Sequence, residues 1–227
     1  LERPDTGCIR VNGETMWDAA DPATQKESEI RKKRLHFGLV FQNFNLFPQY
    51  TALQNVMLAG ELLAKERPEY QANKKAIHAE LEQQARELLA QMGLSERAGH
   101  YPHQLSGGML QRIMIGIATS MKPSLLIADE PTTAIDAITQ FEILDELLRI
   151  KQEHQTAMVF ISHDLNAISR VADRIVVLNQ GLVVDQGDFH HILHHATDSY
   201  TKLLVEKRTD VMRRYSQVLG GKERVYA

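Results

Sequence analysis

Apolar residues along the chain fall into short runs and helical stripes that predict alternating strands and helices. The runs Leu125–Ala128 and Ala157–Ile161 show no alternation, which predicts strands buried on both faces of a parallel sheet. Apolar positions recur at helical spacing from Thr139 to about Lys151, so a helix is expected between the two strands. Strand, helix and strand together form a parallel crossover unit.

Further strands are predicted on either side of this unit. Between Gly7 and Gly13, apolar residues alternate with polar ones. This pattern predicts a strand that ends in a turn at Asn12-Gly13. Another strand is expected from Leu35 to Phe41, after a basic run at 31–34 that we interpret as a solvated face. Residues 174–184 predict a hairpin, because two apolar runs flank Asn179-Gln180-Gly181.

Helical signals dominate residues 51–104. Thr51 and Gln54 have the spacing of a capping box, and the apolar stripe that ends at Met92 is followed by Gly93, a suitable C-terminal cap. We therefore expect a helical subdomain at 51–104, inserted into an α/β core formed by 1–50 and 105–190. Residues 191–227 are expected to form a peripheral helical segment.

Composition limits the range of functions. The chain has 227 residues with 43% hydrophobic and 24% charged residues, typical of a globular domain. A net charge of -3 gives no reason to expect a nucleic-acid partner. The single Cys8 excludes an internal disulfide. Since no apolar run reaches the roughly 18 residues of a membrane span, a membrane role would come through a partner.

Candidate chemistry gathers at the ends of the predicted strands. Asp129 and Glu130 follow one buried strand and His163 follows the next, so all three are expected at the carboxyl edge of the sheet, where α/β proteins bind ligands. Taken alone, the two carboxylates favour the simpler interpretation of a buried strand that runs into a polar turn. Ser106-Gly107-Gly108 opens a helix with bare amides and a hydroxyl, which suits an anion but also an ordinary serine cap.

The order of these segments resembles the nucleotide-binding subunit of ATP-binding-cassette (ABC) transporters over about residues 5–190. The resemblance implies a P-loop NTPase (RecA-like) fold with a helical subdomain, and Mg²⁺-dependent ATP hydrolysis between two head-to-tail subunits. It also implies integral membrane permease subunits as partners, a peripheral position at the cytoplasmic face of the membrane, and no nucleic acid.

The same resemblance assigns roles to individual residues. Gln42 resembles the Q-loop glutamine that senses Mg²⁺, and Asp129 the Walker B aspartate that holds the ion through water. Glu130 resembles the catalytic glutamate, and His163 the switch histidine. The remaining nucleotide-binding positions are the signature motif around Ser106, Gly107 and Gly108, which faces the γ-phosphate on the opposite subunit, and the D-loop Asp136.

One part of the family pattern is missing from these residues. No G-x-x-x-x-G-K-[ST] sequence occurs, so the loop that cradles the phosphates is lacking. We expect an opening unit of on the order of 30 to 40 residues, about one strand, loop and helix, to precede Leu1 in a longer protein. The chain as given is therefore predicted to be a fragment without ATPase activity. Met109 stands where many family members have Gln, but Ser106 and both glycines remain, and Ile135 is a conservative replacement for the usual Leu.

The two halves of the chain resemble different transporters. Residues 41–56 look like subunits that import polar amino acids, whereas the chain from Gly107 onward looks like subunits of nickel, metallophore or peptide importers. We hypothesise a mosaic joined near residues 101–108, with a small polar solute as cargo. The alternatives are a non-transport ABC ATPase, such as a translation or DNA-repair protein, and a truncated cassette without activity.

Four histidines near the end of the chain form i, i+4 pairs on a predicted helix: His190, His191, His194 and His195. This spacing can bind Ni²⁺ or Zn²⁺, but pairs without a third ligand are weak motifs. We interpret them as a solvated helix face.

Overall fold

The computed structural model describes residues 5–133 and 135–218. The chain divides into two compact units, Leu1–Ile161 and Ser162–Ala227. The strands are β1 (Cys8–Val11), β2 (Glu14–Asp18), β3 (Phe37–Val40), β4 (Leu125–Asp129), β5 (Ala157–Ile161), β6 (Ile175–Asn179) and β7 (Leu182–Gly187). The α-helices are α1 (Glu27–Lys33), α2 (Ala52–Ala64), α3 (Tyr70–Gln91), α4 (Gly107–Ser120), α5 (Ala137–His154), α6 (Leu165–Val171), α7 (Phe189–His194) and α8 (Ser199–Val218).

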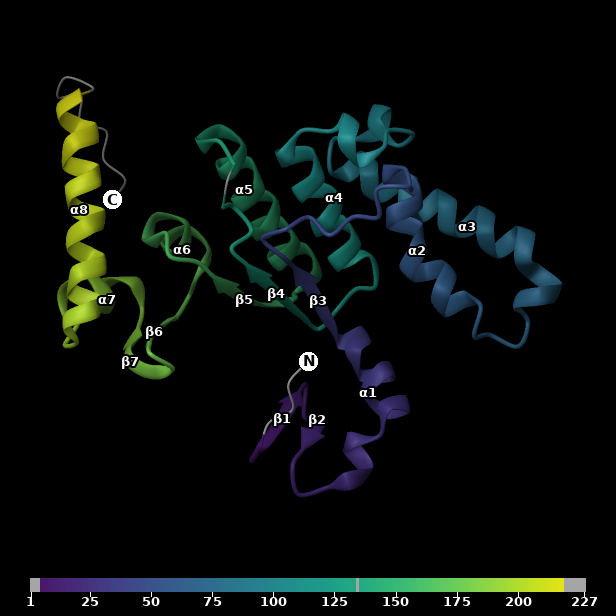
Figure 1. Cartoon of the computed structure of the whole chain (residues 1–227), viewed down its shortest axis with the longest axis horizontal. Coiled ribbons are helices and arrows are strands. Elements are labelled where there is room, and N and C mark those ends of the chain that lie inside the picture. The colour runs from purple at the N-terminus through teal and green to yellow at the C-terminus, as the bar shows by residue number, and fades with distance from the viewer. Residues whose placement is uncertain (1–4, 134, 219–227) are drawn as a thin grey trace. The chain divides into compact units, whose positions relative to one another are not determined.

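The centre of the first unit is a parallel sheet with the strand order β3-β4-β5 (Figure 1). Leu39 pairs with Ile127, and Ile127 with Val159, so β4 lies between its two neighbours. The predicted crossover is confirmed, because α5 connects the parallel strands β4 and β5. The first unit thus has the parallel α/β core that the sequence predicted.

The two faces of this sheet differ in burial, and the prediction of strands buried on both faces is wrong. Leu126 and Ala128 are 0% exposed and join a core that contains residues of α4 and α5. On the opposite face, Val159 and Ile161 of the edge strand β5 are 45% and 46% exposed. Helices cover one face of the sheet within this unit, so only every second residue of each strand meets the core.

Helix α4 approaches β3 closely at one glycine. A Cβ atom on Gly38 would lie 2.4 Å from the carbonyl oxygen of Ala118 and 2.9 Å from the Leu126 side chain. Any larger residue would push the helix away from the strand. Gly38 therefore sets the distance between α4 and the sheet.

The predicted helical segment forms α2 and α3, which lie side by side (Figure 1). The capping box is confirmed, with Thr51 Oγ1 accepting from Gln54 N and Gln54 Oε1 accepting from Thr51 N at 2.9 Å. Gly93 has a φ of +69° directly after α3, as its capping role requires. The buried residues of these helices, including Val56 and Leu89, belong to the same core as Leu126, so the insert has no separate core.

The remaining strands form two antiparallel hairpins, β1–β2 and β6–β7. The turn between β1 and β2 has φ values of +52° at Asn12 and +80° at Gly13, and the turn between β6 and β7 has +50° at Gln180 and +79° at Gly181. Both dipeptides suit a type I′ turn, so the predicted turns are confirmed. Helices α1 and α6, each only seven residues long, were not predicted from the sequence.

In the second unit, Asp185 of β7 accepts hydrogen bonds from the residues just before α8. Thr197 donates its N–H and its hydroxyl to Oδ1 at 3.2 and 3.0 Å, and Asp198 N donates to Oδ2 at 3.1 Å. The pKa of Asp185 is lowered to about 2, first by the buried Thr201 hydroxyl and then by these donors, which outweigh desolvation. Thr201 lies outside ordinary hydrogen-bond geometry, so the Thr197 and Asp198 bonds are the firmer contacts. They tie β7 to the start of α8.

Candidate functional site

The two adjacent carboxylates lie where β4 ends. Asp129 is the last residue of the strand and is exposed. Glu130 has a φ of +47°, and its N–H donates to the Ile161 carbonyl at 2.9 Å. A left-handed conformation at a residue other than glycine is typical of functional sites, where surrounding contacts maintain it. Here the bond to β5 holds the turned backbone in place.

The side chain of Glu130 is also fixed. Thr133 Oγ1 donates to Glu130 Oε2 at 2.6 Å, and Thr133 N donates to the Glu130 carbonyl at 3.2 Å. Pro131 and Thr132 between them are buried. The turn after β4 thus orients one carboxylate while the preceding one stays accessible.

The predicted anion-binding segment forms the start of α4. Ser106 is the N-cap, and its Oγ accepts a long hydrogen bond of 3.4 Å from Met109 N. Gly107 and Gly108 are the first two residues of the helix, so their amides lie at its positive end. Ser106 and Gly107 are exposed, whereas Gly108 is buried. This geometry is suited to an anion, and it also satisfies the simpler interpretation as a serine cap.

Gln42 lies in the segment after β3 and is exposed. The same segment reaches the start of α4, because a Cβ atom on Gly107 would lie 3.7 Å from Phe44 Cζ. Buried Asn55 holds the far end of the segment: it accepts from Phe47 N at 2.9 Å and donates to the carbonyls of Phe47, Tyr50 and Thr51 at 3.0 to 3.2 Å. The Gln42 and Ser106 segments are therefore neighbours within the first unit.

Asp136 is the N-cap of α5. Its Oδ1 accepts from Thr139 N at 3.0 Å. The pKa of this carboxyl is lowered, first by the Thr139 hydroxyl and then by the Thr139 N–H, so it is ionised over the whole neutral range. Asp136 is exposed, which leaves it accessible to a partner.

His163 belongs to the second unit, two residues beyond the end of β5. It precedes Asp164, which caps α6 by accepting from Asn166 N at 2.8 Å. The expectation that His163 joins Asp129 and Glu130 at one edge stays a prediction. The site assignments of the other residues are likewise predictions about chemistry, for which the geometry above is the support.

The four histidines lie on and just after α7. The ring centroids of His190 and His194 are 4.7 Å apart, and those of His191 and His195 are 5.9 Å apart. Among residues 5–133 and 135–218, no group of three or more His, Cys, Asp or Glu side chains is placed to hold a metal ion. The interpretation as a solvated helix face remains our prediction.

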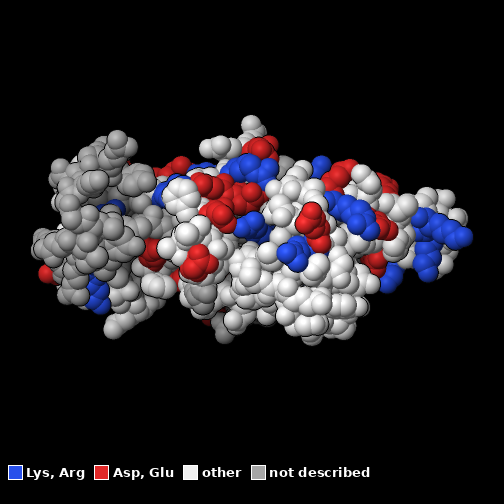
Figure 2. Space-filling view, turned by 90° about the horizontal axis from the view of Figure 1, so that it is seen from above, with Lys and Arg blue, Asp and Glu red and all other residues white. Residues whose placement is uncertain are grey.

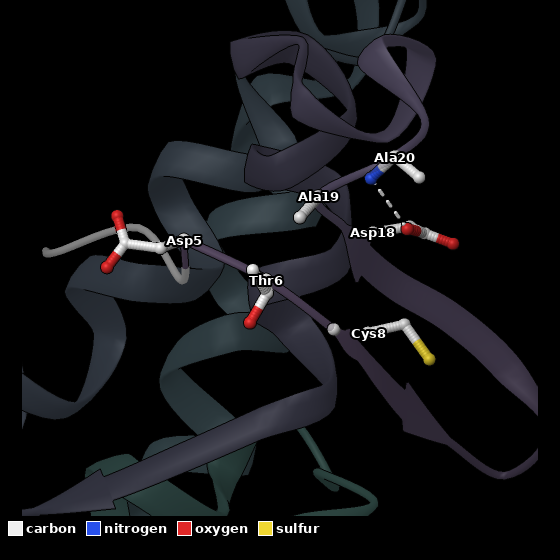
Figure 3. Close-up of a pocket in the computed structure, with 7 residues that line it drawn as sticks. Asp5, Thr6, Cys8, Asp18, Ala19 and Ala20 are labelled. Atoms are coloured by element: carbon white, nitrogen blue, oxygen red, sulfur yellow. Dashed lines mark hydrogen bonds between the residues drawn. The ribbon is translucent and has the colours of Figure 1, made fainter.

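A hollow of about 450 Å³ lies beside the first hairpin. Asp5, Cys8 and Asp18 line it, but Figure 3 shows the Asp5 carboxylate and the Cys8 thiol pointing away from one another. Asp18 Oδ1 accepts from Ala20 N at 2.8 Å, which is an ordinary turn contact. Because the polar groups do not converge, this hollow is not a candidate site.

Figure 2 shows Lys and Arg interspersed with Asp and Glu on the visible face. The predicted solvated run at 31–34 makes ion pairs, including Arg31 to Glu66 at 2.6 Å and Arg34 to Glu27 at 3.2 Å. Within the described ranges, no helix is both long enough and apolar enough to cross a membrane.

Three supporting residues were not identified from the sequence. Thr133, Asn55 and Thr139 contact the candidate site residues or their loops, yet a Thr or Asn in a polar segment carries no distinctive signal. The spacing of Thr133 three residues after Glu130, and of Thr139 three after Asp136, is the only local pattern that marks them.

Comparisons with known proteins agree with this geometry. A sequence model of the family described as "ABC transporter" matches residues 1–133. The L-cystine transport system ATP-binding protein TcyN of Escherichia coli (strain K12) is 38% identical over 207 residues, 91% of this chain and 78% of that protein. The metal-staphylopine import system ATP-binding protein CntD of Staphylococcus aureus (strain NCTC 8325 / PS 47) is 47% identical over 121 residues, 53% of this chain and 45% of that protein.

A solved structure supports the fold. The dimeric post-hydrolysis state of the ATP-binding cassette MJ0796 bound to ADP and Pi aligns with a TM-score of 0.67 and 29% identity, covering 83% of this chain and 75% of that one. The α/β core with its inserted helices therefore has the P-loop NTPase fold. The chain belongs to the ABC transporter family.

Proposed function

We propose that the chain is part of the ATP-binding, ATP-hydrolysing subunit of an ABC importer. The observation that carries the proposal is the turn after β4, where Asp129 is accessible and Glu130 is held by Thr133 at 2.6 Å. Two carboxylates with different surroundings suit two roles, Asp129 for Mg²⁺ through water and Glu130 for the attacking water. The import systems named for TcyN and CntD support the transport role.

The other site residues have complementary roles in this proposal. Gln42 would join Asp129 in sensing Mg²⁺, and oxygen donors of this kind are the ligands that Mg²⁺ prefers. Ser106, Gly107 and Gly108 would face the γ-phosphate of ATP held by a second subunit, with the helix dipole favouring the anion. Asp136 would act across the same interface, and His163 would respond to the γ-phosphate.

The fit to ATP is incomplete within these residues. Since they contain no G-x-x-x-x-G-K-[ST], the backbone cradle and the lysine for the phosphates are lacking. We propose that the 227 residues neither bind ATP tightly nor hydrolyse it, and that a longer protein with a P-loop ahead of Leu1 does both. This missing cradle also favours the second candidate, a cassette without activity of its own.

The test compares two proteins. The purified 227 residues should show no Mg²⁺-dependent phosphate release, whereas a longer reading frame that carries a P-loop should hydrolyse ATP and lose that activity in Glu130→Gln. Stoichiometric ATPase from the 227 residues would overturn the predicted inactivity. An upstream sequence without a P-loop, or an inactive longer protein, would favour the module without activity.

The proposal for the solute is supported by two kinds of relative. TcyN matches 91% of the chain at 38% identity, whereas CntD matches only 53% but at 47% identity. We propose a mosaic in which residues 42 to about 100 choose the membrane partner and hence a polar amino acid as cargo; a long match at lower identity beside a shorter match at higher identity suits such a chain. The carboxyl half would supply hydrolysis, and its sequence resemblance favours nickel, a metallophore or a peptide. Uniform relatedness in a single-genome read through codons 90 to 120 would refute the mosaic.

Partners and location follow from the same role. We propose a head-to-tail dimer with a second ATPase subunit and docking to permease subunits at the cytoplasmic face of the membrane. In this arrangement 1–50 and 105–190 act as the ATPase core, 51–104 as the docking subdomain and 191–227 as a peripheral segment. The compact α2–α3 insert argues against a DNA-repair ATPase with long coiled-coil arms. Co-purification of the longer protein with its neighbouring permease would test the assignment.

A further inference from the structure

Arg208 of α8 contacts two other helices of the second unit. Its Nε donates a hydrogen bond of 2.8 Å to Oδ1 of Asn166 in α6, a residue 42 positions away in the chain. Its guanidinium carbon lies 5.1 Å from the centre of the Phe189 ring in α7. Because Arg208 and Asn166 are partly buried, water competes less for this bond than it does between exposed side chains. One side chain thus joins α8 to α6 and α7.

An apolar cluster beside Arg208 packs the same three helices together. Leu204 and Val205 of α8 and Ile168 of α6 pack against a buried group that includes Ile192 of α7. Leu204 precedes Arg208 by four residues, about one helical turn, so the two side chains lie on the same side of α8. The cluster sets the spacing of the helices, and the hydrogen bond from Arg208 adds a contact with a fixed direction.

Asn166 belongs to the turn that carries His163. Asn166 N donates to Asp164 Oδ1 at 2.8 Å, and Asp164 N donates to Ser162 Oγ at 3.1 Å. His163 lies within this turn and is exposed. The Asn166 carbonyl also accepts from Ser169 Oγ at 2.8 Å. Since its N–H, its carbonyl and its side-chain oxygen are all bonded, Asn166 cannot reorient without breaking a hydrogen bond.

The bonds within the turn are local, whereas the bond from Arg208 is long-range. Hydrogen bonds between residues two positions apart shape a turn but do not fix it against the rest of the unit. Arg208 supplies such a fixed point three residues after His163. A shift of Arg208 therefore moves Asn166, whose N–H holds the carboxylate of Asp164.

We propose that Arg208 is a positioning residue for His163. Its bond to Asn166 transmits the position of α8 to the turn that carries the histidine. A planar guanidinium suits this role, because it can stack on Phe189 while Nε donates in a fixed direction. The contact rests on the geometry of this chain. Only its bearing on ATP hydrolysis rests on the proposed function, in which His163 responds to the γ-phosphate.

The experiment measures amide hydrogen exchange by NMR in the 227-residue protein. Arg208→Met keeps an apolar stem beside Phe189 but removes the donor, so the Asp164 and Asn166 amides should exchange roughly tenfold faster. The backbone amide and ring resonances of His163 should shift in the same variant. Amides of β6 and β7 should exchange at the parent rate, which separates a local effect from a loss of global stability.

A neighbouring cation provides the matched control. Lys207→Met removes one positive charge from an exposed position on the same helix, so the Asp164 exchange rate and the His163 resonances should match the parent. Asn166→Ala removes the acceptor from the other side and should accelerate the Asp164 amide as Arg208→Met does. The double variant N166A/R208M should add little to either single variant, since each removes the same bond.

Three results would overturn the positioning role. They are an unchanged Asp164 exchange rate in Arg208→Met or Asn166→Ala, an equal change in Lys207→Met, and additive effects in the double variant. Asn166→Ala keeps the test decisive if Arg208→Met does not fold.

The longer protein with a P-loop provides the functional readout. Arg208→Met should lower kcat for ATP hydrolysis severalfold and leave KM for ATP unchanged. An unaltered kcat, in a protein that Glu130→Gln inactivates, would overturn the bearing on catalysis and leave the proposed function standing. Because amide exchange does not involve ATP, an inactive longer protein would count against the proposed function alone.

Discussion

The hydroxyl of Thr133 donates a hydrogen bond of 2.6 Å to Oε2 of Glu130, across a turn whose two intervening residues are buried. The bond fixes the one carboxylate at the end of β4 that also has a left-handed backbone. The backbone of Glu130 is held by its N–H bond to the Ile161 carbonyl, and the Thr133 hydroxyl three residues away orients the carboxylate.

Removing the Thr133 hydroxyl should leave the Glu130 carboxylate without this hydrogen bond and lower the stability of the protein. Thr133→Val keeps the shape of the side chain and should reduce the free energy of unfolding by about 1.5 to 3 kcal/mol, as expected for a hydrogen bond to a charged group. Thr133→Ser should stay close to the parent protein. Urea unfolding followed by circular dichroism measures both. A loss in Thr133→Ser with none in Thr133→Val would show that the methyl group, rather than the hydroxyl, matters.

The positive φ at Glu130 makes a second prediction. Both Glu130→Gly and Glu130→Ala remove the carboxylate that bonds Thr133. Glycine adopts the positive φ without steric penalty, whereas alanine keeps the penalty. Glu130→Ala should therefore be less stable than Glu130→Gly by about 0.5 to 1 kcal/mol, measured by urea unfolding. If Glu130→Ala were as stable as Glu130→Gly or more stable, the positive φ would carry no steric penalty at this position, which would contradict the prediction.

Asn55 should be among the most sensitive positions in the first unit. It is 3% exposed and makes four hydrogen bonds to the backbone of residues 47–51. Asn55→Ala would remove all four of these partly buried bonds and should cost about 2 to 4 kcal/mol of unfolding free energy. The exposed neighbour Gln54→Ala offers a comparison, for which loss of half the capping box should cost only about 0.5 to 1 kcal/mol.

Acid should act on the second unit through Asp185. Its folded pKa, about 2, lies below the ordinary value of 3.8, so the stability it contributes is fully present above about pH 4 and is lost as the pH falls toward 2. Asp185→Asn should be less stable at neutral pH and should lose less stability than the parent between pH 4 and 2. Melting curves at several pH values measure this. Parallel curves for both proteins would contradict the role of the carboxylate.

The sequence by itself determined the local elements, because their causes are local. Capping at Thr51, the turns at Asn12-Gly13 and Gln180-Gly181, and the uninterrupted apolar run at 125–128 act over a few residues, and each produced the predicted element. The short helices α1 and α6 were missed, since seven residues supply less than two turns of periodic pattern. The candidate residues at the end of β4 and the start of α4 were likewise recognisable from spacing and order.

Only the tertiary structure decided which side chains support those residues. The contacts of Thr139 with Gly108 and of Phe44 with Gly107 join segments more than thirty residues apart, and no local preference encodes such distances. The open face of the sheet at Val159 and Ile161 was also not foreseeable, because an apolar run looks the same whether helices cover one face or two. At the stretch from Leu125 to Thr132, sequence defined the strand and its carboxylates, and packing then gave Glu130 its fixed orientation.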